Sequence, residues 1–230
     1  LGTSNLHRYN YVTGETKDFK KIIWEDIIAS SRNAIYAVNS VGIGIIEEDS
    51  LRYLHKFAIN YFSNTNFDFK EISPGVLAIA SCNGLLTFNT STYKLDTIFK
   101  KENICVRNIW KYEDYLFFGT YGSGFYIYKD GVLKSLPLDK NKYLLYTHCI
   151  MPDDEGFCWI STNRGLFKTS LAELLNYFDN KTKFVYYHYF GKEDGMDMTE
   201  LNGGCTPCAL RLKNNILSFP TMDGLLWVNP

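Results

Sequence analysis

The chain has 230 residues, of which 46% are hydrophobic, 16% aromatic and 21% charged. This balance excludes an intrinsically disordered chain, which needs low hydrophobicity and high net charge. With 24 basic and 25 acidic residues the formal net charge is −1, so the chain lacks the electrostatic footprint of a protein that binds nucleic acid or an anionic membrane. We expect neither partner for this segment.

The sequence contains no apolar run near the roughly 18 residues that a membrane-spanning helix needs. Its first residues also lack the basic-then-apolar pattern of a signal peptide. The chain begins with Leu1 rather than Met, inside a repeat unit, which indicates a mature or excised segment of a longer protein. Export from the cytoplasm therefore stays open.

The first predicted element is a truncated repeat unit, LGTSNLHRYN, which is followed by an expected outer strand in YNYVTGETKDF. Five fuller copies of the same strand–turn–strand unit come after it, and each has a glycine in its turn. The glycines are Gly44 in AVNSVGIGII, Gly84 in IASCNGLLTF, Gly124 in FGTYGSGFYI, Gly165 in ISTNRGLFKT and Gly224 in FPTMDGLLWV. Their residue numbers differ by 40, 40, 41 and 59.

A period of about 40 residues built from short strands and glycine turns is typical of a four-stranded β-propeller blade. We therefore predict an all-β fold, a β-propeller that forms the C-terminal part of a larger, seven-bladed propeller. The whole chain, 1–230, is expected to be one propeller segment. The expected units are a partial blade at 1–20, blades at about 22–54, 61–99, 103–138 and 146–190, and a last partial blade at 205–230.

One short helical insertion is predicted inside the blade that spans 146–190. Ser170 can cap this helix and Glu173 completes a capping box, while Leu171, Leu174, Leu175 and Phe178 share one side. The insertion explains why the last two turn glycines are 59 residues apart.

The repeat pattern starts and stops inside blades, which leaves two expectations open. Either the terminal strands combine and close a small ring, or further blades lie upstream in the parent protein, and we favour the second. In that case the segment alone exposes inter-blade surfaces and pairs with another chain, as in a homodimer. Residues expected to need a covering blade include Phe117, Phe125, Leu166 and Leu225.

The six cysteines fall into two groups. Cys205 and Cys208 form CTPC, a spacing shared with dithiol redox motifs and zinc half-sites. Zinc would need a second pair, and a redox CxxC belongs at a helix N-terminus, whereas this motif leads into a strand. We expect a local disulfide or two inert thiols, with catalysis or metal binding as the alternative. The other four, expected as buried free thiols, are Cys82, Cys105, Cys149 and Cys158.

Candidate ligand-binding residues follow from the expected fold. In a propeller, the turns between second and third strands and the starts of the innermost strands gather on one face around the central channel, where ligands usually bind. Aromatic rings with Arg, Asn and Asp side chains suit a sugar, whose hydroxyls need hydrogen bonds and whose C–H faces stack on rings. The candidates are Asn83, Tyr121, Asn163, Arg164 and Asp223 in turns, and Arg107 and His148 in innermost strands.

Each candidate also has a structural explanation. Asn83, Asn163 and Asp223 lie at or near turn glycines, where such residues are common turn formers. Arg107 and His148 occupy nearly equivalent places in successive inner strands, where a charged residue in apolar packing is costly unless it reaches the channel. For these two residues ligand contact and a structural role stay equally open.

No enzyme signature is present, since the sequence lacks GxSxG, HExxH, P-loop and Rossmann patterns. Asp153 and Asp154 fall in a turn on the opposite face, where solvated carboxylates are expected, and Trp159 is expected to pack between blades. A lyase would need a His and a Glu that converge on a metal, and His148 alone is too little. We expect no catalytic residue, no metal and no cofactor in this segment.

One repeat resembles those of a known family. DDEGFCWISTNRGLF, from Asp153 to Phe167, is similar almost position for position to the repeat of the periplasmic sensor propellers of Bacteroidetes hybrid two-component regulators. YYHYFGKEDGMDMTELNGG and the closing DGLLWVNP look like the final blade that precedes an Ig-like domain in those proteins. Other copies depart from the pattern, since Gly84 lacks the aspartate turn.

The resemblance implies a periplasmic sensor, part of an inner-membrane protein, that binds an oligosaccharide. It also implies a downstream Ig-like domain, a membrane helix and a histidine kinase in the parent chain. The match is more specific for a propeller than for glycan sensing. A lyase-like propeller enzyme and a protein-interaction scaffold therefore stay as alternatives.

Overall fold

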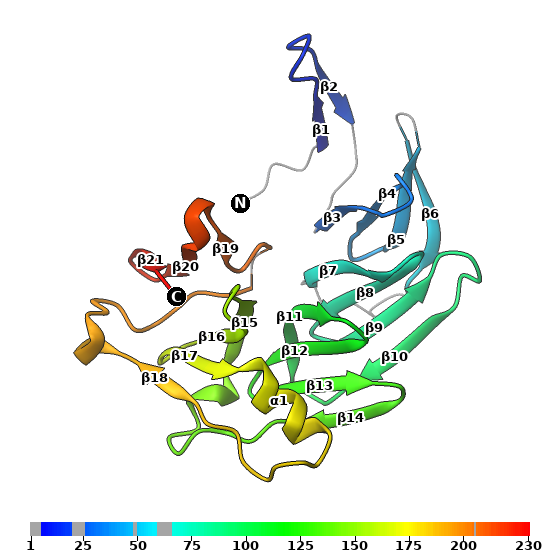
Figure 1. Ribbon diagram of the computed structural model, residues 1–230. Coiled ribbons are helices and arrows are strands. Elements are labelled where there is room, and N and C mark those ends of the chain that lie inside the picture. The colour runs from blue at the N-terminus through cyan, green and yellow to red at the C-terminus, as the bar shows by residue number, and fades with distance from the viewer. Residues whose placement is uncertain (1–5, 20–25, 48–49, 59–65, 205) are drawn as a thin grey trace.

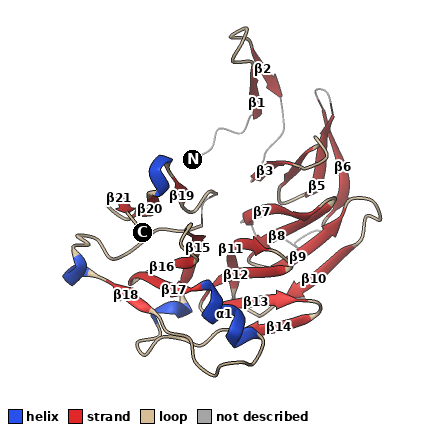
Figure 2. Ribbon diagram, viewed as in Figure 1, coloured by secondary structure: helices blue, strands red, loops and turns tan. Residues whose placement is uncertain are grey.

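The computed structural model describes residues 6–19, 26–47, 50–58, 66–204 and 206–230. These residues form antiparallel sheets with few helical turns, as Figure 2 shows. The predicted all-β propeller fold is confirmed, because successive four-stranded sheets follow one another along the chain. Residues 1–5 of the truncated first repeat, the starts of the blades predicted at 22–54 and 61–99, and Cys205 lie outside the described residues.

Each of four sheets contains four strands that pair in sequential order, and we name these sheets the first to fourth blades. The first blade is β3 (Asp26–Ala29), β4 (Ile35–Val38), β5 (Gly42–Glu47) and β6 (Ser50–Lys56); the second is β7 (Asn66–Ser73), β8 (Val76–Ser81), β9 (Gly84–Asn89) and β10 (Leu95–Phe99). The third is β11 (Cys105–Tyr112), β12 (Tyr115–Tyr121), β13 (Phe125–Lys129) and β14 (Val132–Ser135); the fourth is β15 (Thr147–Pro152), β16 (Phe157–Thr162), β17 (Gly165–Ser170) and β18 (His188–Phe190).

The remaining elements lie at the ends of the chain and in its loops. A hairpin of β1 (Leu6–Tyr9) and β2 (Thr16–Phe19) precedes the first blade, and a last sheet has three strands, β19 (Leu210–Arg211), β20 (Leu217–Thr221) and β21 (Gly224–Val228). The helical elements are α1 (Leu171–Phe178) and the 3-10 turns η1 (Tyr143–Leu145), η2 (Lys192–Asp194) and η3 (Lys213–Asn215). None of the helices in the described ranges is long and apolar enough to cross a membrane.

Figure 1 shows how the blades fan out around a common centre. The innermost strands β3, β7, β11 and β15 lie towards this centre, and the outer strands β6, β10 and β14 lie at the periphery. Apolar side chains pack in the spaces between neighbouring blades. Leu85 of the second blade, for example, shares a core cluster with Val106 and Ile109 of the third. Burial of such residues from water drives the blades together.

In the second, third and fourth blades, the turn between the second and third strands is closed by one hydroxyl group, whereas in the first blade the Asn39 side-chain oxygen accepts from the Val41 and Gly42 N–H groups. The Oγ1 of Thr162 accepts a hydrogen bond from the Arg164 N–H at 3.0 Å and donates to the Gly165 carbonyl at 2.9 Å. Ser81 and Thr120 make the same pair of bonds in the second and third blades. The Ser or Thr that recurs before the turn glycine of these three blades is therefore explained by turn closure.

The predicted helix is present as α1, but the predicted capping box is not. Ser170 is the N-cap residue and makes no side-chain capping bond. Instead, the Leu171 N–H donates to the Gly156 carbonyl, and Glu173 accepts from the Tyr186 N–H at 3.3 Å. The Leu171 N–H and the Glu173 carboxylate, which would take part in capping an isolated helix, are therefore bonded to other parts of the fold.

The cysteine pairing differs from the expectation. Disulfides join Cys82 to Cys105 and Cys149 to Cys208, so three of the four cysteines expected as free thiols are bonded and the local CTPC disulfide is wrong. Cys158 is the free, buried thiol among the described residues, and burial raises its pKa. Each disulfide joins one blade to the start of the next sheet, because the partners meet in the fold although they are distant in sequence. Such bonds persist in oxidising compartments.

A polar contact recurs between the innermost strands of neighbouring blades. The Asp68 carboxylate accepts from the Ile109 N–H at 2.7 Å and from the Asn108 amide at 3.0 Å, and Asn108 in turn accepts from the Ile150 N–H at 3.0 Å. Asp68 and Asn108 occupy equivalent register positions, opposite Ala80 and Gly119. We call this chain of contacts the inter-blade ladder.

Asp153 is not the solvated carboxylate that the sequence suggested. It is only 7% exposed and accepts hydrogen bonds from the Glu155 and Phe157 N–H groups and from the Trp159 indole at 2.8 Å. The acidic turn is therefore a structural device that orients Trp159, which is buried and packs against the last sheet as expected. Asp154 is more exposed and pairs with Arg211.

Candidate functional site

The innermost strands β11 and β15 each contain one extra residue that interrupts the regular pairing, at equivalent positions of the two strands. The pairing of β11 with β12 shifts register between Val106 and Asn108, and the pairing of β15 with β16 shifts between Thr147 and Cys149. The extra residues are Arg107 and His148. A β-bulge bends a strand locally and re-aims the bulged side chain. These equivalent residues, which the sequence singled out, therefore both turn towards the second-to-third-strand turns.

Four of the seven predicted site residues meet there. The Arg107 guanidinium lies over the Tyr121 ring, 5.0 Å from its centroid, and the Tyr121 and His148 rings are 5.7 Å apart. Asn163 joins them, since its Nδ2 donates to the Tyr121 hydroxyl at 3.1 Å and its Oδ1 bonds His148 Nε2. We call Arg107, Tyr121, His148 and Asn163 the turn-face cluster.

The amide of Asn163 determines which nitrogen of His148 carries the proton. Because the Asn163 amide nitrogen donates to Tyr121, its oxygen accepts from His148, so the neutral ring is protonated at Nε2. His148 Nδ1 is buried and has no hydrogen-bond partner among the described residues. It lies next to Gly203, where a Cβ would overlap the imidazole ring. Gly203 therefore closes the back of the cluster.

Burial lowers the pKa of His148, the strongest of the influences on it. The Arg107 charge also lowers this pKa, while the Asn163 bond and the Glu200 carboxylate raise it. Desolvation likewise lowers the pKa of Arg107, opposed by Tyr121. At neutral pH the cluster thus combines a half-buried guanidinium with a neutral imidazole.

A fifth residue, Tyr146, extends the cluster and was not predicted. Its ring lies edge-on to that of Tyr121 with centroids 4.9 Å apart, and the two residues form an isolated β-bridge between the third and fourth blades. Tyr121 and Tyr146 are 37% and 39% exposed, so both present ring surface to solvent. No local pattern pointed to Tyr146, because its contact with Tyr121 depends on how the third and fourth blades pack.

The other three predicted residues lie apart from the cluster. Arg164 and Asp223 are exposed, and the contacts described for both are backbone bonds that close their own turns. Asn83 is half-buried, and its N–H bonds Ser81. The position in the turn explains this division. Tyr121 and Asn163 directly follow the closing hydroxyl residue, and both contact His148, which lies in the next blade for Tyr121 and in the same blade for Asn163. Asn83, Arg164 and Asp223 stand one residue later in their turns.

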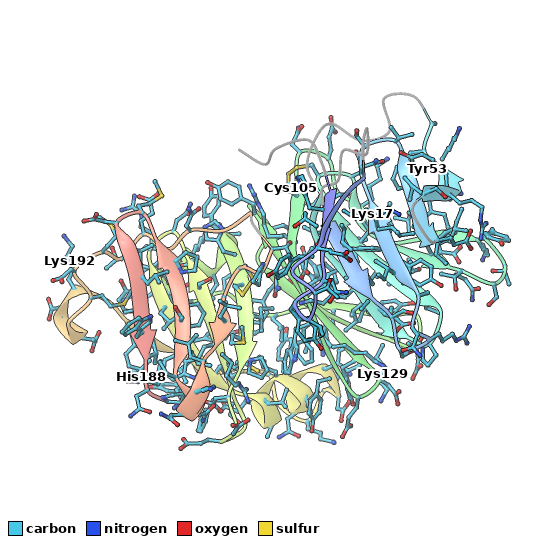
Figure 3. All side chains as sticks on the ribbon, turned by 90° about the horizontal axis from the view of Figure 1, so that it is seen from above. Lys17, Tyr53, Cys105, Lys129, His188 and Lys192 are labelled. Carbon is cyan, nitrogen blue, oxygen red and sulfur yellow. A yellow bond between two sulfur atoms is a disulfide. The ribbon has the colours of Figure 1, made fainter. Side chains whose placement is uncertain are left out.

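The geometry suits recognition of a polar, ring-shaped ligand. Two tyrosine rings at 65° form an aromatic corner, and the Arg107 guanidinium and polar Asn163 lie beside it. Cys105, which begins β11, marks this face in Figure 3, and Lys129 lies on the opposite one. Within the part of the chain that the structure describes, no three His, Cys, Asp or Glu side chains gather as they would around a metal ion.

Comparisons with known proteins address the fold. No protein-family model and no curated protein matches the sequence. Among solved structures, the extracellular domain of the putative hybrid two component system BT3049 from B. thetaiotaomicron is similar at 16% identity and a TM-score of 0.66, over 90% of this chain and 27% of that one. The extracellular domain of the putative hybrid two component system BT4673, from the same organism, is similar at 13% identity and a TM-score of 0.52, over 98% and 37%.

A third similar structure is the WD40 β-propeller domain of Doa1, with 12% identity, a TM-score of 0.58 and coverage of 86% of this chain and 61% of that one. This chain thus spans less than two thirds of the length of each of the three. At such identities the likeness concerns the backbone arrangement and not the side chains of a site. The chain is a β-propeller, and it shares this fold with the extracellular domains of two putative hybrid two component systems.

Proposed function

We propose that this propeller is the extracytoplasmic ligand-sensing part of a two-component regulator, and that it binds an oligosaccharide at the turn-face cluster. The observation that carries the proposal is the aromatic corner of Tyr121 and Tyr146, which stands beside Arg107. Ring faces accept the C–H face of a sugar, and the guanidinium donates hydrogen bonds to hydroxyl or carboxylate oxygens.

Two further observations support the extracytoplasmic setting. The similar structures from B. thetaiotaomicron are described as extracellular domains of hybrid two component systems. The two inter-blade disulfides are also of the kind found in oxidising compartments. Under this proposal a bound ligand is reported to a kinase elsewhere in the parent protein, through an Ig-like domain and a membrane helix.

Isothermal titration of the protein against a panel of plant and host oligosaccharides tests the proposal. We expect binding of at least one member without turnover, which chromatography of the recovered ligand checks. Silence across the panel with a folded protein contradicts oligosaccharide sensing, and turnover indicates a propeller enzyme instead. Arg107→Ala and Tyr146→Ala are each expected to weaken binding about 5- to 150-fold, the equivalent of roughly 1–3 kcal/mol for a lost buried partner.

Tyr93→Ala is a matched control for the tyrosine variant. Tyr93 is 51% exposed in the loop between β9 and β10, away from the cluster, so its loss removes a comparable exposed ring. We expect unchanged affinity for this variant. Equal weakening by Tyr93→Ala and Tyr146→Ala would show that the ligand does not use the aromatic corner.

A further inference from the structure

The hydrogen bonds inside the turn-face cluster occupy its acceptors and leave donors for a ligand. Asn163 Nδ2 donates to the Tyr121 hydroxyl at 3.1 Å, so the hydrogen of that hydroxyl is left to donate to a further group. Asn163 Oδ1 already accepts from His148 Nε2. The remaining nitrogen acceptor, His148 Nδ1, is buried beside Gly203 and does not face solvent. A ligand group that binds here must therefore supply the acceptors.

Arg107 adds the largest set of donors. Its guanidinium carries N–H donors and no acceptor, and it lies 5.0 Å from the centroid of the Tyr121 ring. The side chain is half-buried, and this desolvation is the strongest influence on the pKa of Arg107, which it lowers. Taking a positive charge partly out of water costs free energy, and an anion within hydrogen-bond distance offsets that cost.

A second cation stands at the same turn. Lys101, in the loop between β10 and β11, donates through Nζ to the Ser123 hydroxyl at 3.0 Å. Ser123 follows Tyr121 by two residues, and its oxygen is 2.7 Å from the Tyr126 hydroxyl. These bonds hold the ammonium group of Lys101 against the turn. Lys101 and Arg107 therefore both place positive charge beside Tyr121, which favours an anionic ligand.

We propose that the ligand of this cluster is an acidic oligosaccharide, with a carboxylate bound by Arg107 and the Tyr121 hydroxyl and a sugar ring against Tyr146. This inference rests on the proposed function and names the class of ligand for the same site. A carboxylate presents only acceptors, so it matches a set of donors better than a sugar hydroxyl, which both donates and accepts. The planar guanidinium also binds a carboxylate through a pair of parallel N–H···O bonds.

Isothermal titration with uronic-acid oligosaccharides tests the requirement for an anion. Each oligosaccharide is used in its native form and after reduction of its carboxylates to primary alcohols, which keeps the rings and the linkages. We expect the native form to bind at least about tenfold more tightly, because it alone forms charge-assisted hydrogen bonds with Arg107. Equal affinities of the two forms, or binding of neutral oligosaccharides alone, would overturn the inference but leave oligosaccharide sensing intact. If no acidic or neutral oligosaccharide binds, the proposed function fails as well.

Substitution of Arg107 tests which group binds the carboxylate. Arg107→Gln is expected to abolish the preference for the native form, and Arg107→Lys, which keeps the charge without the planar pair of donors, to retain part of it. Arg164→Gln is the matched control, because it removes the same charge from an exposed side chain in the turn of the fourth blade. Equal loss of the preference in Arg107→Gln and Arg164→Gln would show that net charge selects the ligand, and would overturn the inference. Near-ultraviolet circular dichroism verifies that each variant is folded.

The His148 imidazole reports where the carboxylate binds in the unmodified protein. Burial lowers the pKa of this ring most and the Arg107 charge lowers it further, so a carboxylate paired with Arg107 weakens the second effect. The other groups that face the ring are Tyr121 of β12, Asn163 of the turn between β16 and β17, and Glu200 and Gly203 of the segment after η2. Proton NMR titration is expected to show a higher His148 pKa with the native form bound than with the reduced form bound. Equal values would place the carboxylate away from Arg107 and overturn the inference.

Discussion

Asp26 and Asp68 occupy the same place in the innermost strands of consecutive blades, opposite Val38 and Ala80, yet their surroundings differ. Asp68 accepts hydrogen bonds from Asn108 and Ile109 and pairs with Lys70 at 3.0 Å. Asp26 accepts a 2.8 Å hydrogen bond from the N–H of its own neighbour Ile27, and the Thr206 hydroxyl and the Phe69 N–H contribute weaker bonds. Within the described ranges, its buried Oδ2 has no close hydrogen-bond donor.

Burial raises the pKa of Asp26 to about 6, an effect that nearby Asp68 strengthens and the Ile27, Thr206 and Phe69 groups oppose. The comparison extends to the fourth blade, where Cys149 holds the equivalent position and the disulfide to Cys208 replaces a ladder hydrogen bond. One position thus joins neighbouring sheets by different chemistries. The strength of each contact between sheets depends on the number of hydrogen-bond donors that reach the residue at this position, or on whether the contact is a covalent bond.

Removal of the Cys149–Cys208 disulfide is expected to have the largest effect on the free energy of unfolding. The Cys149–Cys208 disulfide closes a separation of 59 residues and the Cys82–Cys105 disulfide one of 23. Loop entropy in the unfolded chain predicts losses of about 4 and about 3 kcal/mol for the respective double serine variants. Urea unfolding followed by circular dichroism measures both. A smaller loss of unfolding free energy for Cys149→Ser/Cys208→Ser than for Cys82→Ser/Cys105→Ser would contradict this prediction.

Asp68→Ala tests the carboxylate that accepts hydrogen bonds from the neighbouring blade. The substitution leaves the Ile109 N–H and the Asn108 amide without their acceptor, so we expect a loss of about 3 kcal/mol in the free energy of unfolding. Asp68→Asn keeps an acceptor oxygen and is the matched control, with an expected loss of about 1 kcal/mol. If the two variants are equally stable in urea, the ladder contacts at this interface do not hold the blades together.

Sequence reasoning predicted much of this architecture, because glycine turns and strand alternation are local signals. The repeat placed Gly84, Gly165 and Gly224 at equivalent turns, and the structure has them there with positive φ. Gly44 was wrong as a turn glycine, since it lies inside β5 and Gly42 begins that strand. Strand alternation is a weaker signal in the blade at 61–99, because its innermost strand β7 breaks the alternation with two register shifts.

Contacts between blades were not predictable in the same way. Cys149 and Cys208 come together only when the fourth blade packs on the last sheet, so their spacing in sequence carried no signal. The site shows the same limit. Arg107 and His148 were recognised as equivalent, but the contact of Tyr146 with Tyr121 depends on the packing of neighbouring blades.

The raised pKa of Asp26 predicts that the stability of the protein depends on pH. Because the pKa of Asp26 is raised from 3.8 to about 6 in the folded state, its contribution to stability is fully present below pH 3.8 and is lost as the pH rises through 6. The shift corresponds to at most about 3 kcal/mol, and solvent screening of the partly exposed carboxyl reduces this to about 1–2 kcal/mol. Urea unfolding between pH 4 and 7 is expected to show this decline in the wild type relative to Asp26→Asn. Parallel curves for the two proteins would contradict it.

The smallest expected effect concerns the boundary between the ladder and the turn-face cluster. His148 directly precedes the ladder position Cys149, yet its ring is oriented by Asn163 of the neighbouring turn. Because the Asn163 bond raises the pKa of His148, Asn163→Ala is expected to lower that pKa further while the free energy of unfolding changes by less than about 1 kcal/mol.

Proton NMR titration of the imidazole measures the pKa change in Asn163→Ala, and Arg164→Ala in the same turn is the control. Arg164 is exposed, and its described hydrogen bond uses its backbone N–H, so its side chain can be removed without touching the imidazole contact. An unchanged His148 pKa in Asn163→Ala would mean that burial alone determines the charge of the imidazole. In that case β15 and Gly203 would determine the orientation of the His148 ring, and the turn that contains Asn163 would not.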